Sequence, residues 1–202
     1  MRIRLDVRDL LLASWETDRE AVARAAPSGA EPAEVDGRYL VSLVSFHVRG
    51  GRIGKLPVLP FSQLNLRTYV TWKDEPAVLF LASRVTPGGL PGLLLGAPYR
   101  SARLRVKGGE LRAPGLGVEI LYRPGAQADP GELGRHELGV FEAGDLKAIR
   151  IVRSPAAWAG AELLAPAQAH MLLGYGFSPR GEPDLVYTPA TSFQTEPAKK
   201  LS

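Results

Sequence analysis

The segment FSQLNLRTYVTW at residues 61–72 alternates polar and apolar side chains with the period of two that is typical of a β-strand. One face of such a strand carries apolar side chains, namely Leu64, Leu66, Val70 and Trp72. The opposite face carries polar ones, namely Gln63, Asn65, Arg67, Tyr69 and Thr71. Two explanations fit this polar face: water on the outside of a sheet, or a ligand inside a pocket.

The neighbouring segments are strongly apolar and are expected to be strands as well. Residues 38–47 are rich in β-formers and too short for a typical helix, which predicts a buried strand followed by a turn at Gly50-Gly51. Residues 77–82 form another apolar run, and the polar turn before it predicts a hairpin with the 61–72 strand. We therefore expect this hairpin to lie centrally, although its spacing alone favours neither solvent nor a pocket.

Few helices are predicted elsewhere in the chain. The sequence TDRE at residues 17–20 is a capping box, so a short helix is expected from there to about residue 26. Residues 156–165 are also expected to be helical. The whole pattern predicts a single β-dominated domain over residues 1–194 and a disordered tail over residues 195–202, where an apolar anchor is almost missing.

Composition and charge exclude several classes of protein. The 202-residue chain has no cysteine, and its three histidines form no metal-binding motif, so we expect no metal and no other cofactor. No apolar run approaches the roughly 20 residues of a membrane helix, and no secretory signal is recognisable, so the cytoplasm is the expected location. The net charge of +4 comes from scattered basic residues, which does not indicate nucleic-acid binding.

The order of several motifs gives this sequence a family resemblance. Trp15-Glu16-Thr17-Asp18 opens the predicted helix, Val35-Asp36-Gly37 leads into the next strand, and the string LNLRTYV at residues 64–70 is the most specific match. This order resembles the YqjF-like family of the acetoacetate decarboxylase-like superfamily, over roughly residues 5–190. The resemblance implies a mostly β (α+β) fold with few short helices, in which an antiparallel sheet wraps around a cone-shaped barrel that holds a small-molecule pocket.

True decarboxylases of this superfamily use a lysine that forms a Schiff base with a β-keto acid. By position, the resemblance places Arg8 near a carboxylate-binding arginine, and it puts Gln63 where those enzymes have a glutamate. The segment expected to hold the lysine reads RVTPGGLP at residues 84–91 and contains none. A guanidinium stays protonated at neutral pH and cannot form an iminium, and an amide cannot ionise. The resemblance therefore implies a protein without Schiff-base chemistry.

The leading hypothesis is a small-molecule-binding protein whose polar-lined pocket takes an anionic or carbonyl-bearing ligand, such as a carboxylic acid. Two arginines are expected to hold the negative charge, amides and a phenol to orient the ligand, and a third arginine to lie at the rim. The expected ligand-binding residues are Arg8, Gln63, Asn65, Arg67, Tyr69 and Arg84.

Two alternatives stay open at this point. One is a lyase or hydrolase that acts on a keto acid without an iminium and uses Tyr69 or Glu119 as acid or base. The other is a scaffold in which Arg67 pairs internally with a carboxylate and binds nothing. Members of the superfamily form larger assemblies, so a homo-oligomer also fits the resemblance.

Overall fold

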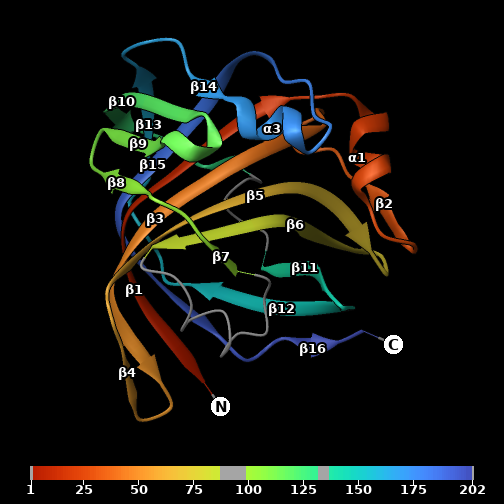
Figure 1. Cartoon of the computed structure of the whole chain (residues 1–202), viewed down its shortest axis with the longest axis horizontal. Helices are drawn as coiled ribbons and strands as arrows, with labels where there is room; N and C mark the ends of the chain where they lie inside the picture. Colours follow the sequence, from red (N-terminus) through yellow and green to blue (C-terminus); the bar gives the residue numbers. More distant parts are fainter. Residues whose placement is uncertain (1, 87–98, 132–136, 202) are drawn as a thin grey trace.

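The strands of this chain form one continuous sheet whose central part curves around an interior (Figure 1). We describe it from a computed structural model that covers residues 2–86, 99–131 and 137–201. The central strands are β1 (Ile3–Glu16), β3 (Leu40–Ile53), β5 (Phe61–Trp72), β6 (Glu75–Thr86), β11 (Leu138–Ala143), β12 (Asp145–Arg153) and β15 (Arg180–Thr195).

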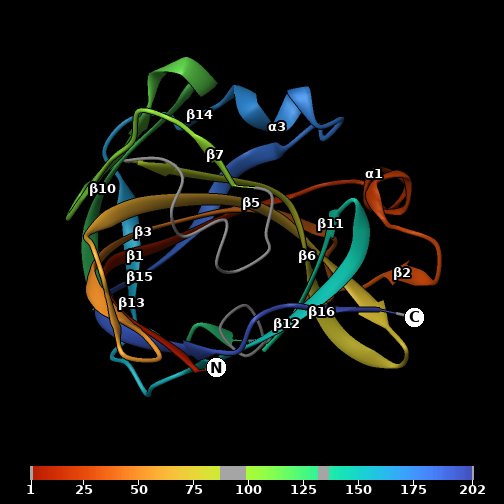
Figure 2. The same cartoon turned by 60° about the horizontal axis from the view of Figure 1, so that its bottom comes forward.

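These strands follow one another around a closed path, in the order β12, β11, β6, β5, β3, β1 and β15. The path closes because β12 pairs with β15, where Ile151 lies opposite Thr195 and Arg153 lies opposite Phe193. Neighbouring strands are antiparallel except for a short parallel pairing of β6 with β11. The ring is not a regular barrel, but its strands surround a common interior (Figure 2), which confirms the predicted fold class.

The remaining elements extend this ring or lie against its outer face. From β15 the sheet continues through β13, β10, β9 and β8, and α1 and α3 pack beside it. These elements are α1 (Arg19–Ala25), β2 (Ala30–Pro32), β4 (Leu56–Val58), β7 (Tyr99–Ser101), β8 (Arg105–Lys107), β9 (Glu110–Ala113), the 3₁₀ turn η1 (Pro114–Leu116), β10 (Val118–Gln127), β13 (Ala159–Leu163), β14 (Gln168–Ala169), α3 (His170–Gly174) and β16 (Lys199–Lys200).

Two apolar clusters cover the outer face and the inner face of the ring. The outer cluster joins Leu66 of β5 to Val22 of α1 and to Leu111 of β9. The inner cluster includes Leu10 and Phe46, which face the interior of the ring. Because both faces of the central strands are covered, polar groups on the inner face are shielded from bulk water.

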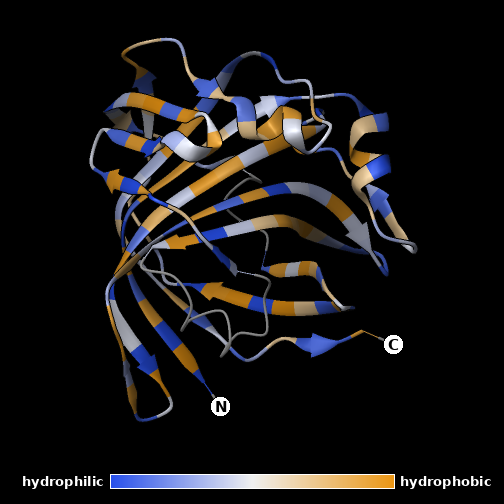
Figure 3. Ribbon diagram, in the orientation of Figure 1, coloured by the Kyte–Doolittle hydropathy of each residue, from blue (hydrophilic) through white to orange (hydrophobic). Residues whose placement is uncertain are grey.

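The β5–β6 hairpin is formed as the sequence predicts. Its two-residue turn, Lys73-Asp74, has positive φ at both positions, 49° and 62°, which matches the right-handed twist of the flanking strands. In β5 every residue except Thr71 is buried, including the polar ones. Figure 3 shows these polar residues as blue and white bands among the orange of the neighbouring segments. The polar face of β5 is therefore not a solvated surface.

Two local predictions near the N-terminus are wrong. Gly50-Gly51 is not a turn, because β3 runs through it and pairs with β1. A Cβ on Gly51 would lie 2.1 Å from the Arg4 carbonyl oxygen, so the glycine serves a close approach of two strands. The capping box is also absent: α1 has Asp18 as its N-cap, and the Thr17 hydroxyl is buried with no hydrogen-bond partner among the described residues.

The C-terminal half differs from the sequence-based expectation in two places. Residues 159–163 form β13, not a helix, because β10 and β15 supply hydrogen-bond partners on both of its edges. The tail does not lie free, since Lys199-Lys200 forms β16 along β12 and the Thr195 hydroxyl donates to the Arg150 carbonyl oxygen at 2.7 Å. Within the described residues, we find no helix that is long and apolar enough to span a bilayer.

Candidate functional site

The interior of the ring holds a cavity of about 100 Å³. Each strand of the ring, or a residue next to its end, contributes to the lining, which is apolar over most of its surface. The polar residues of the lining are Gln63, Asn65, Arg67, Ser83, Tyr99, Glu137, Arg153 and Thr195. Apolar walls with a few converging polar groups are the usual construction of a small-molecule site.

Three of the sequence-predicted residues line this cavity side by side. Gln63, Asn65 and Arg67 lie on the inner face of β5 and are only 6%, 5% and 7% exposed. They share this face because successive residues of a strand alternate between its two sides. The alternation read from the sequence therefore places these three side chains correctly, and their role toward a ligand stays a prediction.

The amides form a network with two further side chains. The Gln63 Nε2 donates to Asn65 Oδ1 at 2.8 Å, and the Ser83 hydroxyl donates to the same oxygen at 2.9 Å. The Asn65 Oδ1 thus accepts two hydrogen bonds. No described residue accepts a hydrogen bond from the Asn65 Nδ2. The Tyr99 phenol is hydrogen-bonded to the Gln63 side chain, and burial raises the pKa of Tyr99 to about 12. At neutral pH this wall of the cavity therefore offers hydrogen-bond donors and carries no charge.

Arg67 is held by a chain of buried hydroxyls that crosses three strands. Its Nη2 donates to Tyr69 Oη at 3.1 Å, Tyr69 Oη lies 3.0 Å from Ser42 Oγ, and Ser42 Oγ lies 2.7 Å from Ser14 Oγ. A guanidinium can only donate, so the Tyr69 oxygen accepts from Arg67, while either hydroxyl can be the donor in the other two contacts. Tyr69 is thus a positioning residue that lies behind Arg67, and it does not line the cavity.

A second guanidinium, that of Arg153 at the end of β12, lines the same cavity. The pKa of Arg153 is lowered to about 10, first by burial and then by the positive charge of Arg67, while Glu137 acts in the opposite direction. Both side chains line one cavity of about 100 Å³, so the two cations border the same small space. Two guanidinium groups against the one carboxylate of Glu137 give this mostly apolar cavity an excess of positive charge, which favours an anion.

Besides Tyr69, two predicted site residues lie away from the cavity, and each lies next to a β-bulge. In β1, odd-numbered residues such as Leu5 face the interior before Asp9, and even-numbered ones such as Leu10 do so after it. Asp9 has a φ of 51°, and the register against β3 shifts between Arg8 and Leu11. Arg8 precedes this irregularity, so its side chain is exposed on the outer face.

Arg84 is displaced for the same reason on β6. The register against β5 shifts between Leu66 and Arg67. Even-numbered residues such as Phe80 face the cavity before this shift, and odd-numbered residues such as Ser83 face it after the shift. Arg84 then points outward, and its Nη2 donates to Tyr175 Oη at 3.1 Å. The acid or base considered above, Glu119, also lies elsewhere, since it pairs with Arg112 at 3.0 Å on the neighbouring strand β9. We assign none of these three residues to the site.

Sequence reasoning missed five polar residues of the lining: Ser83, Tyr99, Glu137, Arg153 and Thr195. Only Arg153 had a signal, because Ile149, Ile151 and Arg153 alternate along β12 and line the cavity together. The other four are brought in by a bulge or lie at or next to the end of a strand. Among the residues that the structure describes, no group of three or more His, Asp or Glu side chains could hold a metal ion.

Comparison with known proteins identifies the family. Residues 4–142 match the family model DUF2071, described as an uncharacterized conserved protein. This chain belongs to the DUF2071 family. It is also 36% identical over 78 residues to the uncharacterized protein YqjF of Bacillus subtilis, a match that covers 37% of this chain and 32% of that relative. The chain thus matches only about a third of the length of this relative, and the match confirms the YqjF-like resemblance.

Solved structures of low sequence identity share the fold. Acetoacetate decarboxylase from Legionella pneumophila has a TM-score of 0.70 at 13% identity, covering 100% of this chain and 88% of that one. The enduracididine biosynthesis enzyme MppR complexed with pyruvate has a TM-score of 0.66 at 13% identity, covering 99% of this chain and 90% of that one. These similarities confirm the acetoacetate decarboxylase-like fold.

Proposed function

We propose that this protein binds a small carboxylic acid, of the size of a short keto acid, in the cavity inside the ring. The observation that carries the proposal is the presence of two guanidinium groups, Arg67 and Arg153, at an otherwise mostly apolar cavity. Guanidinium groups bind carboxylates through charge-assisted hydrogen bonds, which are stronger in surroundings shielded from water.

The volume of the cavity sets the size of the ligand. A cavity of about 150 Å³ in another protein admits benzene, so a cavity of about 100 Å³ suits roughly four to six non-hydrogen atoms. A carboxylate between the two arginines leaves room for a carbonyl or a methyl group. The carbonyl oxygen would accept hydrogen bonds from Asn65 Nδ2 or Tyr99, which lie on the uncharged polar wall.

The proposal does not include a Schiff base. None of the described residues that line the cavity is a lysine. The nearest lysine along a cavity strand is Lys147, which precedes the lining residue Ile149 by two positions on β12. Similarity in fold to MppR, whose structure was determined with pyruvate, supports an acid as the ligand. It does not support the lysine chemistry, which needs a primary amine at the reacting carbonyl.

Calorimetric titration of the purified protein with pyruvate tests this proposal. Substitution of Arg67 by Leu should lower the affinity about 10- to 100-fold, because a hydrogen bond to a charged group contributes about 1.5–3 kcal/mol. Arg8→Leu is the matched control, since this arginine is exposed outside the cavity and its loss should change the affinity less than twofold. Equal pyruvate affinity of wild type and Arg67→Leu would remove Arg67 from the site.

Two further ligand experiments separate binding from covalent chemistry. Acetone, which lacks the carboxylate, should bind at least about tenfold more weakly than pyruvate if the guanidinium contacts dominate. Borohydride added together with pyruvate should leave the protein mass unchanged. A stable adduct on any lysine, Lys147 included, would contradict the absence of an iminium and restore the decarboxylase mechanism.

A second candidate function is turnover of a keto acid without an iminium. It is supported by the Tyr99 phenol at the cavity, whose raised pKa of about 12 keeps it protonated as a donor to a developing enolate oxygen. Incubation with acetoacetate and detection of acetone by NMR tests it, with Tyr99→Phe as the comparison. Acetone formation at the spontaneous rate, unchanged by Tyr99→Phe, would leave binding as the function.

A further inference from the structure

A second, more open depression adjoins the cavity on the side of β12. We call it the outer groove, and its own residues are Pro130, Ser154, Pro155, Ala156 and Trp158. It shares Glu137 and Arg153 with the cavity, so these two residues lie at the junction of the two spaces. A ligand held at Arg153 therefore lies next to the outer groove.

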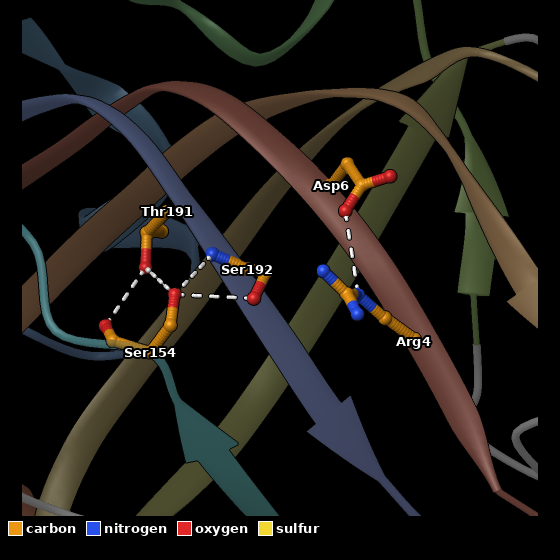
Figure 4. Close-up of polar contacts among 5 residues, drawn as sticks. All are labelled: Arg4, Asp6, Ser154, Thr191 and Ser192. Carbon is orange, nitrogen blue, oxygen red and sulfur yellow. Dashed lines mark hydrogen bonds and ion pairs between the residues drawn. The ribbon is translucent and has the colours of Figure 1, made fainter.

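The chain that forms the outer groove is fixed at both ends. Directly after Arg153, the Ser154 amide donates to the Ser192 carbonyl oxygen at 2.9 Å, and the Ser192 amide donates to Ser154 Oγ at 2.9 Å. The Thr191 hydroxyl adds a bond to the Ser154 carbonyl oxygen at 3.2 Å, and Figure 4 shows this cluster beside β15. At the other end, the Ala128 amide donates to the Trp158 carbonyl oxygen at 3.0 Å. Hydrogen bonds within the protein therefore hold both ends of this chain segment.

The surface of the outer groove differs chemically from that of the cavity. About half of its surface is polar, and the apolar part is formed by the half-buried Trp158 ring and the rings of Pro130 and Pro155. The Arg153 guanidinium carbon lies 5.7 Å from the centroid of the Trp158 ring, so the cation and the aromatic surface are immediate neighbours. The flat face of the Trp158 ring favours a planar ring of a ligand, which can stack on it.

We propose that the outer groove is a second subsite, which takes the planar, apolar end of an acid whose carboxylate lies at Arg153 and Arg67. This inference rests on the proposed function. The cavity of about 100 Å³ holds the acid group and its carbonyl but not a ring as well, so an aryl-substituted keto acid has to extend past Arg153. The substrate class is then arylated short keto acids, and a bare short acid fills only the inner subsite.

Titration with pyruvate and with phenylpyruvate tests the second subsite. Wild-type protein should bind phenylpyruvate about threefold to tenfold more tightly than pyruvate, the gain expected from one stacked aromatic contact. Trp158→Leu should abolish this preference and leave the pyruvate affinity within twofold. Trp158→Phe, which keeps a ring, should retain most of the preference. Tyr175→Leu is the control, because this exposed aromatic residue lies away from both spaces and its loss should change neither affinity.

The outcomes separate the two proposals. If pyruvate binds and Arg67→Leu weakens it, but phenylpyruvate binds no more tightly than pyruvate, the second subsite is refuted and the proposed function stands. An equal loss of both affinities in Trp158→Leu also refutes the subsite, because it shows a general structural effect. If wild type binds neither acid, both proposals are refuted.

Discussion

The hydroxyl chain behind Arg67 allows a quantitative prediction for Tyr69→Phe. This substitution keeps the buried ring and removes one oxygen, which lies 3.1 Å from Arg67 Nη2 and 3.0 Å from Ser42 Oγ. Loss of a hydrogen bond to a charged group costs about 1.5–3 kcal/mol, and loss of a neutral one about 1 kcal/mol. The free energy of unfolding should therefore fall by about 2–4 kcal/mol. For a chain of this size that corresponds to a decrease of roughly 6–12 °C in Tm.

Denaturant unfolding and pyruvate titration of the same preparations measure both consequences. Tyr187→Phe is the matched control, because Tyr187 is also buried and donates to Asp9 Oδ1 at 2.8 Å, but on the outer side of the ring. Both variants should lose stability, and only Tyr69→Phe should also lose pyruvate affinity, by about tenfold, since Arg67 is no longer oriented. Unchanged stability and affinity of Tyr69→Phe would refute the reasoning, as would an equal affinity loss in Tyr187→Phe.

Two further variants test the packing and the charge of the ring. Gly51→Ala should lower the free energy of unfolding by about 3 kcal/mol or more, because its Cβ would lie 2.1 Å from the Arg4 carbonyl oxygen. Gly50→Ala is the control and should change it by about 1 kcal/mol or less, because its Cβ would lie 3.7 Å from the Val58 carbonyl oxygen. Similar denaturation midpoints for the two variants would contradict the close approach of the strands. Because burial and Arg67 lower the pKa of Arg153 to about 10, its positive charge is lost as the pH rises through that value, so pyruvate affinity should fall above pH 10 in wild type. Arg153→Met should bind pyruvate more weakly at pH 8, and its pyruvate affinity should show no further decrease near pH 10. Without ligand, this variant should have a higher free energy of unfolding than wild type. If the pH profile of Arg153→Met equals that of wild type, Arg153 does not hold the acid.

The sequence predicts β5 well because a two-residue period needs no knowledge of the rest of the fold. Gln63, Asn65 and Arg67 follow from that period, and the apolar flanks of the strand indicated a central hairpin. The period fails where a bulge adds a residue, since every later side chain then changes face. Arg8 and Arg84 both lie next to such irregularities, and nothing in their local sequence shows which face they take.

The rest of the site depends on the closure of the ring, which no local pattern encodes. Arg153 reaches the cavity because β12 pairs with β15, whose paired residues lie 40 to 44 positions away in the chain. Tyr99 and Glu137 lie at the ends of strands whose places are set by parallel pairing with β6. The sequence could name the arginine on β5, but the second cation on which the proposed anion site depends is visible only in three dimensions.

The central claim is that Arg67 and Arg153 together hold a carboxylate inside the ring. A crystal structure of the protein grown with pyruvate tests it most directly. The account predicts ligand density in the cavity, with carboxylate oxygens about 2.7–2.9 Å from guanidinium nitrogens of both arginines. Pyruvate bound only outside the ring, or joined covalently to a lysine, would contradict it.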